Sequence, residues 1–250
     1  MTQPSMISRV SDVLRIFQGS EKALSVSDIG RRAGIPKASA ARIVAEMVDV
    51  GLLEHDGDKI QLGIRMFELG QHANRPIDLR KLALPTMSEL MKATGQTVHL
   101  AVLEGTEVVY IQILRSRSTP PLPSRVGGRL PAYATGVGKV LLAYAPVAVI
   151  DEICDAPMVS IGPKTITEPA RLRNEIATIR SNRIAFEREE STTNVGCAAA
   201  PILNALGDAI AAISVSVHLH QTDLSKMGPA VATAAMSLSR EAARSRLLQH

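Results

Sequence analysis

The side chains best suited to chemistry lie between residues 187 and 220. They are carboxylates, a thiol, hydroxyls and imidazoles: Glu187, Glu189, Glu190, Cys197, Ser214, Ser216, His218 and His220. A thiol becomes a nucleophile only with a nearby base and a lowered pKa, and nothing in the spacing brings a histidine to Cys197. The apolar segment CAAAPI, which begins at Cys197, is typical of a strand with an inert thiol. We therefore expect no catalytic residue.

A metal site would have to use the same residues. Cys197, Glu187 and a histidine are suitable ligand types. However, Cys154 and Cys197 form no CxxC pair and no Cys/His cluster, so we expect neither a metal nor another cofactor. Two distant cysteines are also typical of reduced thiols in a cytoplasmic protein.

Ser214 and Ser216 are better suited to binding. They alternate with Ile213, Val215 and Val217, so both hydroxyls belong to one face of a strand and the aliphatic side chains to the other. The hydroxyl face could line a wet pocket or could be an ordinary solvent face. The sequence leaves both interpretations open.

A glycine motif and a run of basic residues precede this region. Gly136-Val137-Gly138 opens a predicted helix, and the free N–H groups of a helix start favour an anion; a plain turn is the alternative. The range Val108–Ile150 holds basic residues and no acidic one: Arg115, Arg117, Arg125, Arg129 and Lys139. These charges would suit a small organic acid, although a solvated face or a subunit contact explains most of them as well.

The segment from residue 25 to residue 70 predicts helices and a hairpin. Ser27 can cap a short helix, Asp28–Ala33, and Gly34 ends it. Pro36 opens a second helix, Lys37–Val50, which Gly51 ends. Two strands, Leu52–Glu54 and Lys59–Leu62, flank an Asp-Gly pair, which indicates a hairpin.

The second helix has one apolar face and one face suited to DNA. The apolar positions are Ile43, Val44, Met47, Val48 and Val50, which we expect to be buried. The other face offers small residues and donors near the helix start, as entry into a major groove requires. We expect DNA contacts from Arg9, Ser27, Arg31, Lys37, Ala38, Ser39, Ala41, Arg42, His55 and Lys59. A small helical domain used for protein contact is the alternative.

The remaining chain alternates helices with antiparallel strands. Arg75-Pro76 is expected to interrupt any helix in the linker that precedes Asp78. We expect helices at Asp78–Thr94, Gly136–Ala145, Thr167–Asn182 and Leu224–Leu248, and strands at Thr97–Leu103, Val108–Leu114, Ile184–Glu187, Cys197–Leu203 and Ala209–His218. This pattern predicts an α+β fold.

Composition excludes several classes of protein. The chain of 250 residues is 46% hydrophobic and 21% charged, which is typical of a globular protein. Only 2% of its residues are aromatic, which argues against a stacking platform for single-stranded nucleic acid. The net charge of +4 fits DNA contact without requiring it. We find no signal peptide and no membrane span, and expect a cytoplasmic protein.

Three segments make the chain resemble the IclR-type transcriptional regulators. They are IGRRAGIPKASAARIVAEMVDVGLLEHDGDKIQLG, then GGRLPAYATGVGKVLLAY, then AFEREESTTNVGCAAAPI followed by AAISVSV. The resemblance implies a winged helix-turn-helix domain over residues 1–70 and a GAF-like effector domain over 81–250, joined by a linker helix in the linker over 71–80. It further implies a homodimer or dimer of dimers, a palindromic double-stranded DNA operator and a small-molecule effector.

The resemblance also implies which residues form the effector pocket: Leu122, Gly136, Val137, Glu187, Cys197, Ser214 and Ser216. The sequence departs from the family pattern at several positions. Ala38-Ser39 replaces the usual Ser-Thr, and Arg183-Ile184-Ala185 replaces Gly-Tyr-Ala. Glu187 stands where Asp is common, and Asn194 where Gly is common.

Three functions compete at this point. The leading hypothesis is a ligand-responsive regulator, a repressor that senses an anionic metabolite. The second is a small-molecule enzyme fused to a DNA-binding domain, in which Cys197→Ala would abolish turnover. The third is an architectural DNA protein without a ligand. The acid-poor stretch and the two-serine strand favour the first over the third.

Overall fold

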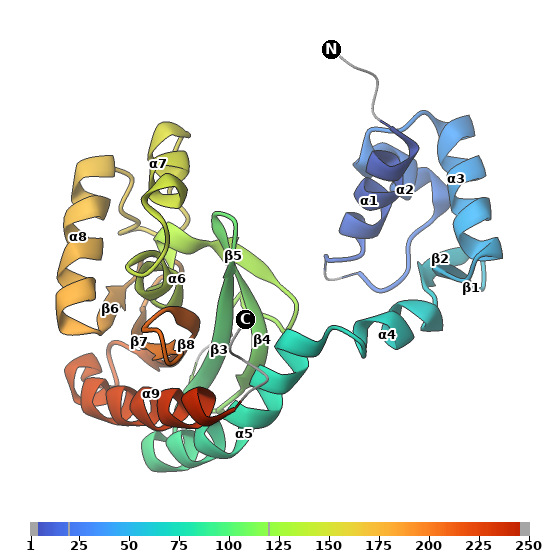
Figure 1. The fold of residues 1–250 in the computed structure, drawn as a ribbon. Coiled ribbons are helices and arrows are strands. Elements are labelled where there is room, and N and C mark those ends of the chain that lie inside the picture. The colour runs from blue at the N-terminus through green and yellow to red at the C-terminus, as the bar shows by residue number, and fades with distance from the viewer. Residues whose placement is uncertain (1–4, 20, 120, 246–250) are drawn as a thin grey trace. The chain divides into compact units, whose positions relative to one another are not determined.

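The computed structural model describes residues 5–19, 21–119 and 121–245, and it divides into two compact units (Figure 1). The first unit covers residues 1–74 and the second residues 75–250. Helices and a hairpin form the first unit, and a six-stranded antiparallel sheet with helices forms the second. The predicted α+β class is confirmed.

Three helices and a two-stranded hairpin build the core of the first unit. Their bounds are α1 Met6–Ile16, α2 Val26–Ala33, α3 Lys37–Asp49, β1 Leu53–Asp56 and β2 Lys59–Leu62. Gly34 ends α2 in the left-handed conformation, at φ 65°, as predicted. The hairpin turn is Gly57-Asp58, and Gly57 has φ 62°.

The core of this unit differs from the prediction at three points. Ser25, not Ser27, caps α2, because the helix begins at Val26 and the Ser25 hydroxyl accepts the amide of Asp28 at 3.1 Å. Val50 is 51% exposed rather than buried, because it follows the last residue of α3. Helix α1, which was not predicted, starts at a Ser5 cap and buries Val13.

Two helices run through the linker region, in agreement with the expected linker helix. Helix α4 covers Ile64–Gly70, and α5 covers Asn74–Thr94. Arg75-Pro76 does not interrupt α5, because Pro76 lies in its first turn, where a missing N–H costs no intrahelical bond. Pro85 also lies inside α5.

The sheet of the second unit has the order β5-β4-β3-β8-β7-β6. The strands are β3 Thr97–Glu104, β4 Glu107–Leu114, β5 Arg129–Pro131, β6 Ala185–Arg188, β7 Val195–Leu203 and β8 Ala209–His218. Strand β5 was not predicted. Every pairing is antiparallel, so side chains at neighbouring register positions form rows across the sheet.

Helices cover both faces of this sheet (Figure 1), and a cluster of buried apolar side chains lies on each face. On one face, α5 and α9 (Met227–Arg244) pack on residues such as Ile213, Val215 and Val217. The other face is covered by shorter helices: η1 Ala132–Ala134, α6 Gly136–Leu142, α7 Val147–Asp155 and α8 Pro169–Asn182. Polar residues of β3, β6 and β8 face this second layer.

The predicted helix ends also need adjustment. Helix α8 begins at Pro169 rather than at Thr167, and Glu168 precedes it without a capping hydrogen bond from its side chain. Helix α7 was not predicted. The last helix begins after the short turn η2 Leu224–Lys226 and ends at Arg244, and the predicted positions 246–248 lie outside the described residues.

No helix within the described residues has both the length and the hydropathy needed to span a bilayer.

Candidate functional site

A cavity lies between the sheet and the start of α6, and all seven predicted effector residues line it. It is small: the space inside it that a water-sized sphere can reach is about 30 Å³, enough for about two water molecules and far below the usual volume of a small-molecule site. The predicted lining residues come from a loop, a helix and three strands: Leu122, Gly136, Val137, Glu187, Cys197, Ser214 and Ser216. The structure therefore brings together residues that are up to 94 positions apart in the sequence (122 to 216).

Strand register explains why the polar residues of the cavity converge. Glu187 of β6 pairs with Cys197 of β7, which pairs with Ser216 of β8. Their side chains thus form one row across the sheet. Ser214 and Ser216 are only 1% and 5% exposed, so the solvent-face alternative for these hydroxyls is wrong.

Gly136 allows the backbone of α6 to approach the sheet closely. A Cβ atom at this position would lie 3.1 Å from the Cys197 Sγ atom, closer than ordinary van der Waals contact. Thr135 caps the helix, and its hydroxyl accepts the amide of Gly138 at 3.0 Å. The amides of Gly136 and Val137 precede the first intrahelical hydrogen bonds, which leaves them able to bind an acceptor in the cavity.

His99 is a central polar residue of the cavity that the sequence reasoning missed. Its Nε2 atom lies 2.9 Å from the Ser124 hydroxyl and its Nδ1 atom 3.5 Å from the Ser216 hydroxyl. Burial lowers the pKa of His99 to about 3, and Arg115 adds to the effect, so the imidazole is neutral near pH 7. The sequence holds a signal that could have identified His99, the same as at Ser214. Thr97, His99 and Ala101 alternate with apolar neighbours.

Cys197 is buried in the cavity wall as a protonated thiol. Burial raises its pKa to about 12, and the negative charge of Glu187 acts in the same direction. A nucleophilic thiol requires the opposite shift. The chemistry of Cys197 is therefore that of a small, weakly polar contact residue.

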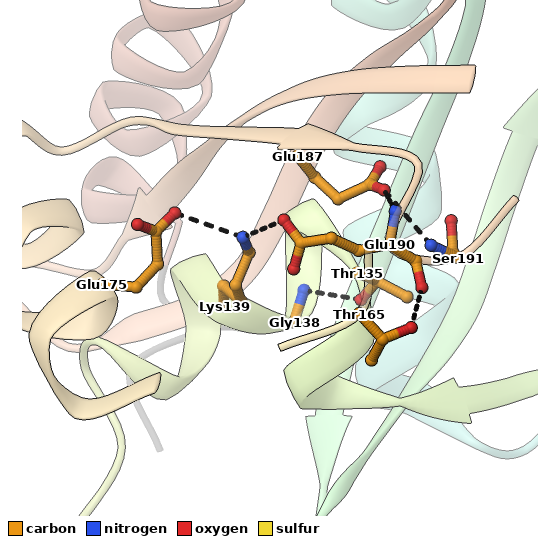
Figure 2. A network of polar contacts seen from close by, with 8 residues as sticks. All are labelled: Thr135, Gly138, Lys139, Thr165, Glu175, Glu187, Glu190 and Ser191. Atoms are coloured by element: carbon orange, nitrogen blue, oxygen red, sulfur yellow. Dashed lines mark hydrogen bonds and ion pairs between the residues drawn. The ribbon is translucent and has the colours of Figure 1, made fainter. Parts of the chain in front are cut away.

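Glu187 places a carboxyl group in the cavity. Its Oε1 atom accepts the amides of Glu190 at 2.5 Å and Ser191 at 3.2 Å (Figure 2). Burial nevertheless raises the pKa of Glu187 to about 7, and Glu190 contributes to the increase. This carboxyl is consequently divided between its protonated and ionised forms at neutral pH.

A buried ion-pair cluster lies beside the cavity (Figure 2). Lys139, on α6, is fully buried and donates to Glu190 at 2.6 Å and to Glu175, on α8, at 3.2 Å. Glu190 Oε2 is also buried and has no hydrogen-bond partner among the described residues. The nearby Glu189 pairs with Lys164 at 2.6 Å. Of the three glutamates noted in the sequence, Glu187 thus lines the cavity, whereas Glu189 and Glu190 form ion pairs with lysines.

The basic residues of the range Val108–Ile150 do not surround the pocket, in line with the alternative that most of them serve elsewhere. None of the five basic residues between Val108 and Ile150 lines the cavity. Arg115 donates to the Ser124 carbonyl, Arg129 pairs with Glu107, and Lys139 binds its two glutamates. Arg117 and Arg125 are exposed. Charge counted along the sequence did not reveal where each side chain points.

Two departures from the family pattern lie at left-handed backbone positions. Arg183 has φ 57° and Asn194 has φ 60°, a region that glycine adopts without strain and asparagine tolerates. Asn194 does not line the cavity; its Oδ1 atom contacts His220 Nε2 at 2.8 Å. Of the departures noted near the pocket, Glu187 alone reaches the cavity.

The predicted DNA-contacting residues lie mostly on the surface of the first unit. Ser27, Arg31, Lys37, Ala38, Ala41, Arg42, His55 and Lys59 are exposed, and Arg9 and Ser39 are half-buried. Arg31 pairs with Asp28 at 2.6 Å and Arg32 with Glu21 at 2.9 Å. Lys37 and Arg42, both on α3, form no ion pair within the described residues, so they are the available cations of this helix.

Sequence comparison assigns each unit to a known domain. The IclR helix-turn-helix domain matches residues 6–57, and the domain described as "Bacterial transcriptional regulator IclR C-terminal" matches residues 71–240. The chain is 30% identical over 220 residues to the HTH-type transcriptional regulator XynR of Escherichia coli, covering 87% of each chain. It is 34% identical over 213 residues to RhmR of the same organism, an uncharacterised HTH-type transcriptional regulator, covering 84% of this chain and 81% of that protein.

A solved structure shows the same fold with a bound small molecule. It is an IclR homolog from Microbacterium hydrocarbonoxydans complexed with 4-hydroxybenzoate. The two chains are 34% identical with a TM-score of 0.88, and the match covers 96% of this chain and 100% of the other.

Proposed function

The chain belongs to the IclR family of DNA-binding transcriptional regulators, and from this premise we propose that it is a repressor controlled by a small organic acid. In this proposal the first unit binds a palindromic operator, as part of a homodimer or a dimer of dimers in the cytoplasm. The acid occupies the cavity lined by Glu187, Ser214 and Ser216. The observation that carries the proposal is the convergence of the seven expected effector residues on one cavity.

Helix α3 is the proposed recognition helix. It presents Lys37, Ala38, Ala41 and Arg42 on its exposed side, while Ile43 and its neighbours bury the other side. Small side chains permit close approach to base edges, and unpaired cations provide contacts to phosphates or guanines. His55 and Lys59 of the hairpin are exposed and are the proposed contacts to the flanking DNA backbone.

Self-association is proposed because helix α4 carries exposed apolar residues. Ile64, Phe67 and Leu69 are 66%, 63% and 55% exposed, an arrangement that marks an interaction surface more often than a solvated helix. A second copy of the chain would bury them and would place two recognition helices on one palindrome. The palindrome and the dimer thus depend on each other in this proposal.

The proposed effector is a small monocarboxylate, with benzoates as the first class to test. The bound 4-hydroxybenzoate of the related structure supports this class. The free space of about 30 Å³ is smaller than a single ring, so the proposal requires that the cavity walls move apart on binding. The amides of Gly136 and Val137 are the proposed partners of the carboxylate. The hydroxyls of Ser214 and Ser216 are proposed to orient the polar groups, and Leu122 to cover the apolar body.

Effector binding is proposed to alter the relative placement of the two winged helices in a dimer. Such coupling requires that the acid bind one arrangement more tightly than the other. The proposal therefore concerns an equilibrium between two arrangements, and it predicts that the acid and the operator weaken each other's binding by the same factor.

Thermal unfolding of the full chain against aromatic and aliphatic carboxylates tests the effector class. A bound acid raises the midpoint by mass action, and we expect the largest shift with a benzoate. Ser214→Ala with Ser216→Ala should remove the shift, whereas Ser88→Ala, on helix α5 away from the cavity, should retain it. No shift with any carboxylate would contradict the proposed class.

A further inference from the structure

The carboxyl groups around the cavity outnumber the cations. Glu187, Glu190 and Glu175 lie close together, whereas Lys139 provides the single ammonium group that the described residues place among them (Figure 2). Lys139 already donates to Glu175 and Glu190. Within the part of the chain that the structure describes, Glu187 therefore has two backbone amides as partners and no direct ion pair.

Among the groups that the described residues place around Glu187, Lys139 of α6 is the cation, and its lowering effect on the pKa of Glu187 is smaller than the effect of burial, since its ammonium group is bound to Glu190 and Glu175. The other groups are uncharged or acidic. They are the Cys197 thiol of β7, the Tyr110 phenol of β4, the neutral His99 of β3, the hydroxyls of Ser214 and Ser216 of β8, and Glu190 in the loop after β6. Arg115 lies beyond His99 and donates to the Ser124 carbonyl. A carboxylate that enters this cavity meets a second carboxyl rather than a cation.

We propose that the cavity binds its organic acid together with one proton, which Glu187 takes up from solvent. This inference rests on the proposed function, because it assumes that the effector is a carboxylate. On binding, the effector anion enters, Glu187 gains H⁺ at one carboxyl oxygen, and the net charge of the cavity stays the same. The protonated Glu187 then donates a hydrogen bond to the bound acid in place of a repulsive contact.

Simple electrostatics gives the direction of the effect. A second negative charge within a few ångströms raises the pKa of a carboxyl further, and the pKa of Glu187 is already raised to about 7 by burial. Between this pKa and its higher value in the complex, binding consumes a proton. The dissociation constant of the acid should thus rise about tenfold for each pH unit above 7 and change little below 7.

Because of this proton uptake, the affinity for an acid depends on pH, whereas the affinity for a neutral analogue does not. A neutral ligand of the same shape, such as 4-hydroxybenzamide, adds no charge beside Glu187. Its affinity should remain nearly constant between pH 6 and pH 8. The contrast between the acid and the amide isolates the carboxyl-to-carboxyl interaction from general effects of pH on the fold.

Calorimetric titration of the full chain with 4-hydroxybenzoate at pH 6, 7 and 8, in two buffers of different ionisation enthalpy, measures the uptake directly. We expect up to one proton per site in the wild type, and none in Glu187→Gln, whose side-chain carbonyl can still accept the amides of Glu190 and Ser191. Glu189→Gln is the matched control: Glu189 pairs with Lys164 outside the cavity, so this variant should behave as the wild type.

Infrared difference spectra of the unliganded protein provide a second readout. A protonated carboxyl that ionises between pH 6 and pH 8 should be present in the wild type and absent in Glu187→Gln; its absence in both would overturn the inference. Binding of 4-hydroxybenzoate without proton uptake, or with equal uptake in Glu187→Gln, would also overturn the inference while leaving the effector class intact. No binding of any carboxylate would overturn the proposed function and this inference together.

Discussion

The two candidate sites of this protein are built in opposite ways. The proposed DNA surface comes from one continuous segment, in which exposed side chains such as Lys37 and Arg42 have no ion-pair partners within the described residues. The proposed effector cavity comes from distant segments, and its polar groups are buried and bonded to one another or to their neighbours. Substitutions in the first site should therefore change binding alone, whereas substitutions in the second should change binding and stability together.

The largest expected effect is on Lys139. Lys139→Met should lower the free energy of unfolding by about 3–5 kcal/mol, because it leaves Glu190 buried without its cation. Lys164→Met is the control: its ammonium group pairs with Glu189 at the surface, where an ion pair contributes about 1 kcal/mol or less. Urea titration followed by circular dichroism measures the free energy of unfolding of both variants. Equal losses would show that the buried cluster stabilises the protein no more than the surface ion pair does.

Glu187 should make stability depend on pH. Its pKa is about 7 in the folded protein, above the ordinary value of 4.5. The folded state therefore binds more protons than the unfolded state between these values, and stability falls as pH rises from about 4.5 to about 7. Glu187→Gln should equal the wild type near pH 4.5 and exceed it by roughly 1–3 kcal/mol at pH 8.

Urea titrations of both proteins across this pH range measure the difference. A constant gap between them would indicate a packing effect of the amide, and a wild-type advantage at pH 8 would contradict the assignment of a raised pKa to Glu187.

A substitution of Arg42 tests the proposed DNA surface. Arg42→Ala should weaken operator binding about tenfold or more, because a guanidinium contact to a base or phosphate is lost, with no change in unfolding. Arg32→Ala, which removes a side chain paired with Glu21, should weaken binding less. Fluorescence anisotropy with operator DNA provides the affinities; unchanged affinity for Arg42→Ala would remove α3 from the recognition surface.

The smallest expected effect is at Arg183, at the end of α8. Its φ of 57° is costly for any residue with a Cβ atom, so Arg183→Gly should raise the free energy of unfolding by up to about 1 kcal/mol. Arg180→Gly, inside the same helix, should instead lower it. Thermal unfolding distinguishes the two, and a loss of stability in Arg183→Gly would show that the arginine side chain contributes more than the backbone costs.

Local patterns in the sequence predicted local structure well. The alternation around Ser214 gave strand β8 with its bounds, and Gly34 and the Asp-Gly pair gave a helix end and a turn. The choice of Ser27 over Ser25 as a cap failed because two serines in one short segment are equally suited. Helices α1 and α7 were missed because each buries few residues, Val13 and Ile153 respectively.

The cavity could be predicted only in part. The family resemblance indicated its seven residues, but His99 was missed because a single histidine in an apolar strand is more often a core residue. The direction in which the Lys139 side chain points depends on how α6 and α8 pack, and no pattern along the chain specifies that packing. The charge count between Val108 and Ile150 failed for the same reason, since sequence gives the number of charges and not the face on which each one lies.

We propose that the cavity and the operator-binding surface are thermodynamically coupled. Fluorescence anisotropy of labelled operator with the full chain, at increasing 4-hydroxybenzoate, measures this coupling. We expect a saturating acid to raise the dissociation constant for the operator about tenfold or more, and Ser214→Ala with Ser216→Ala to remove this response while unliganded affinity is retained. Unchanged operator affinity with the acid demonstrably bound would show that the two sites are not coupled.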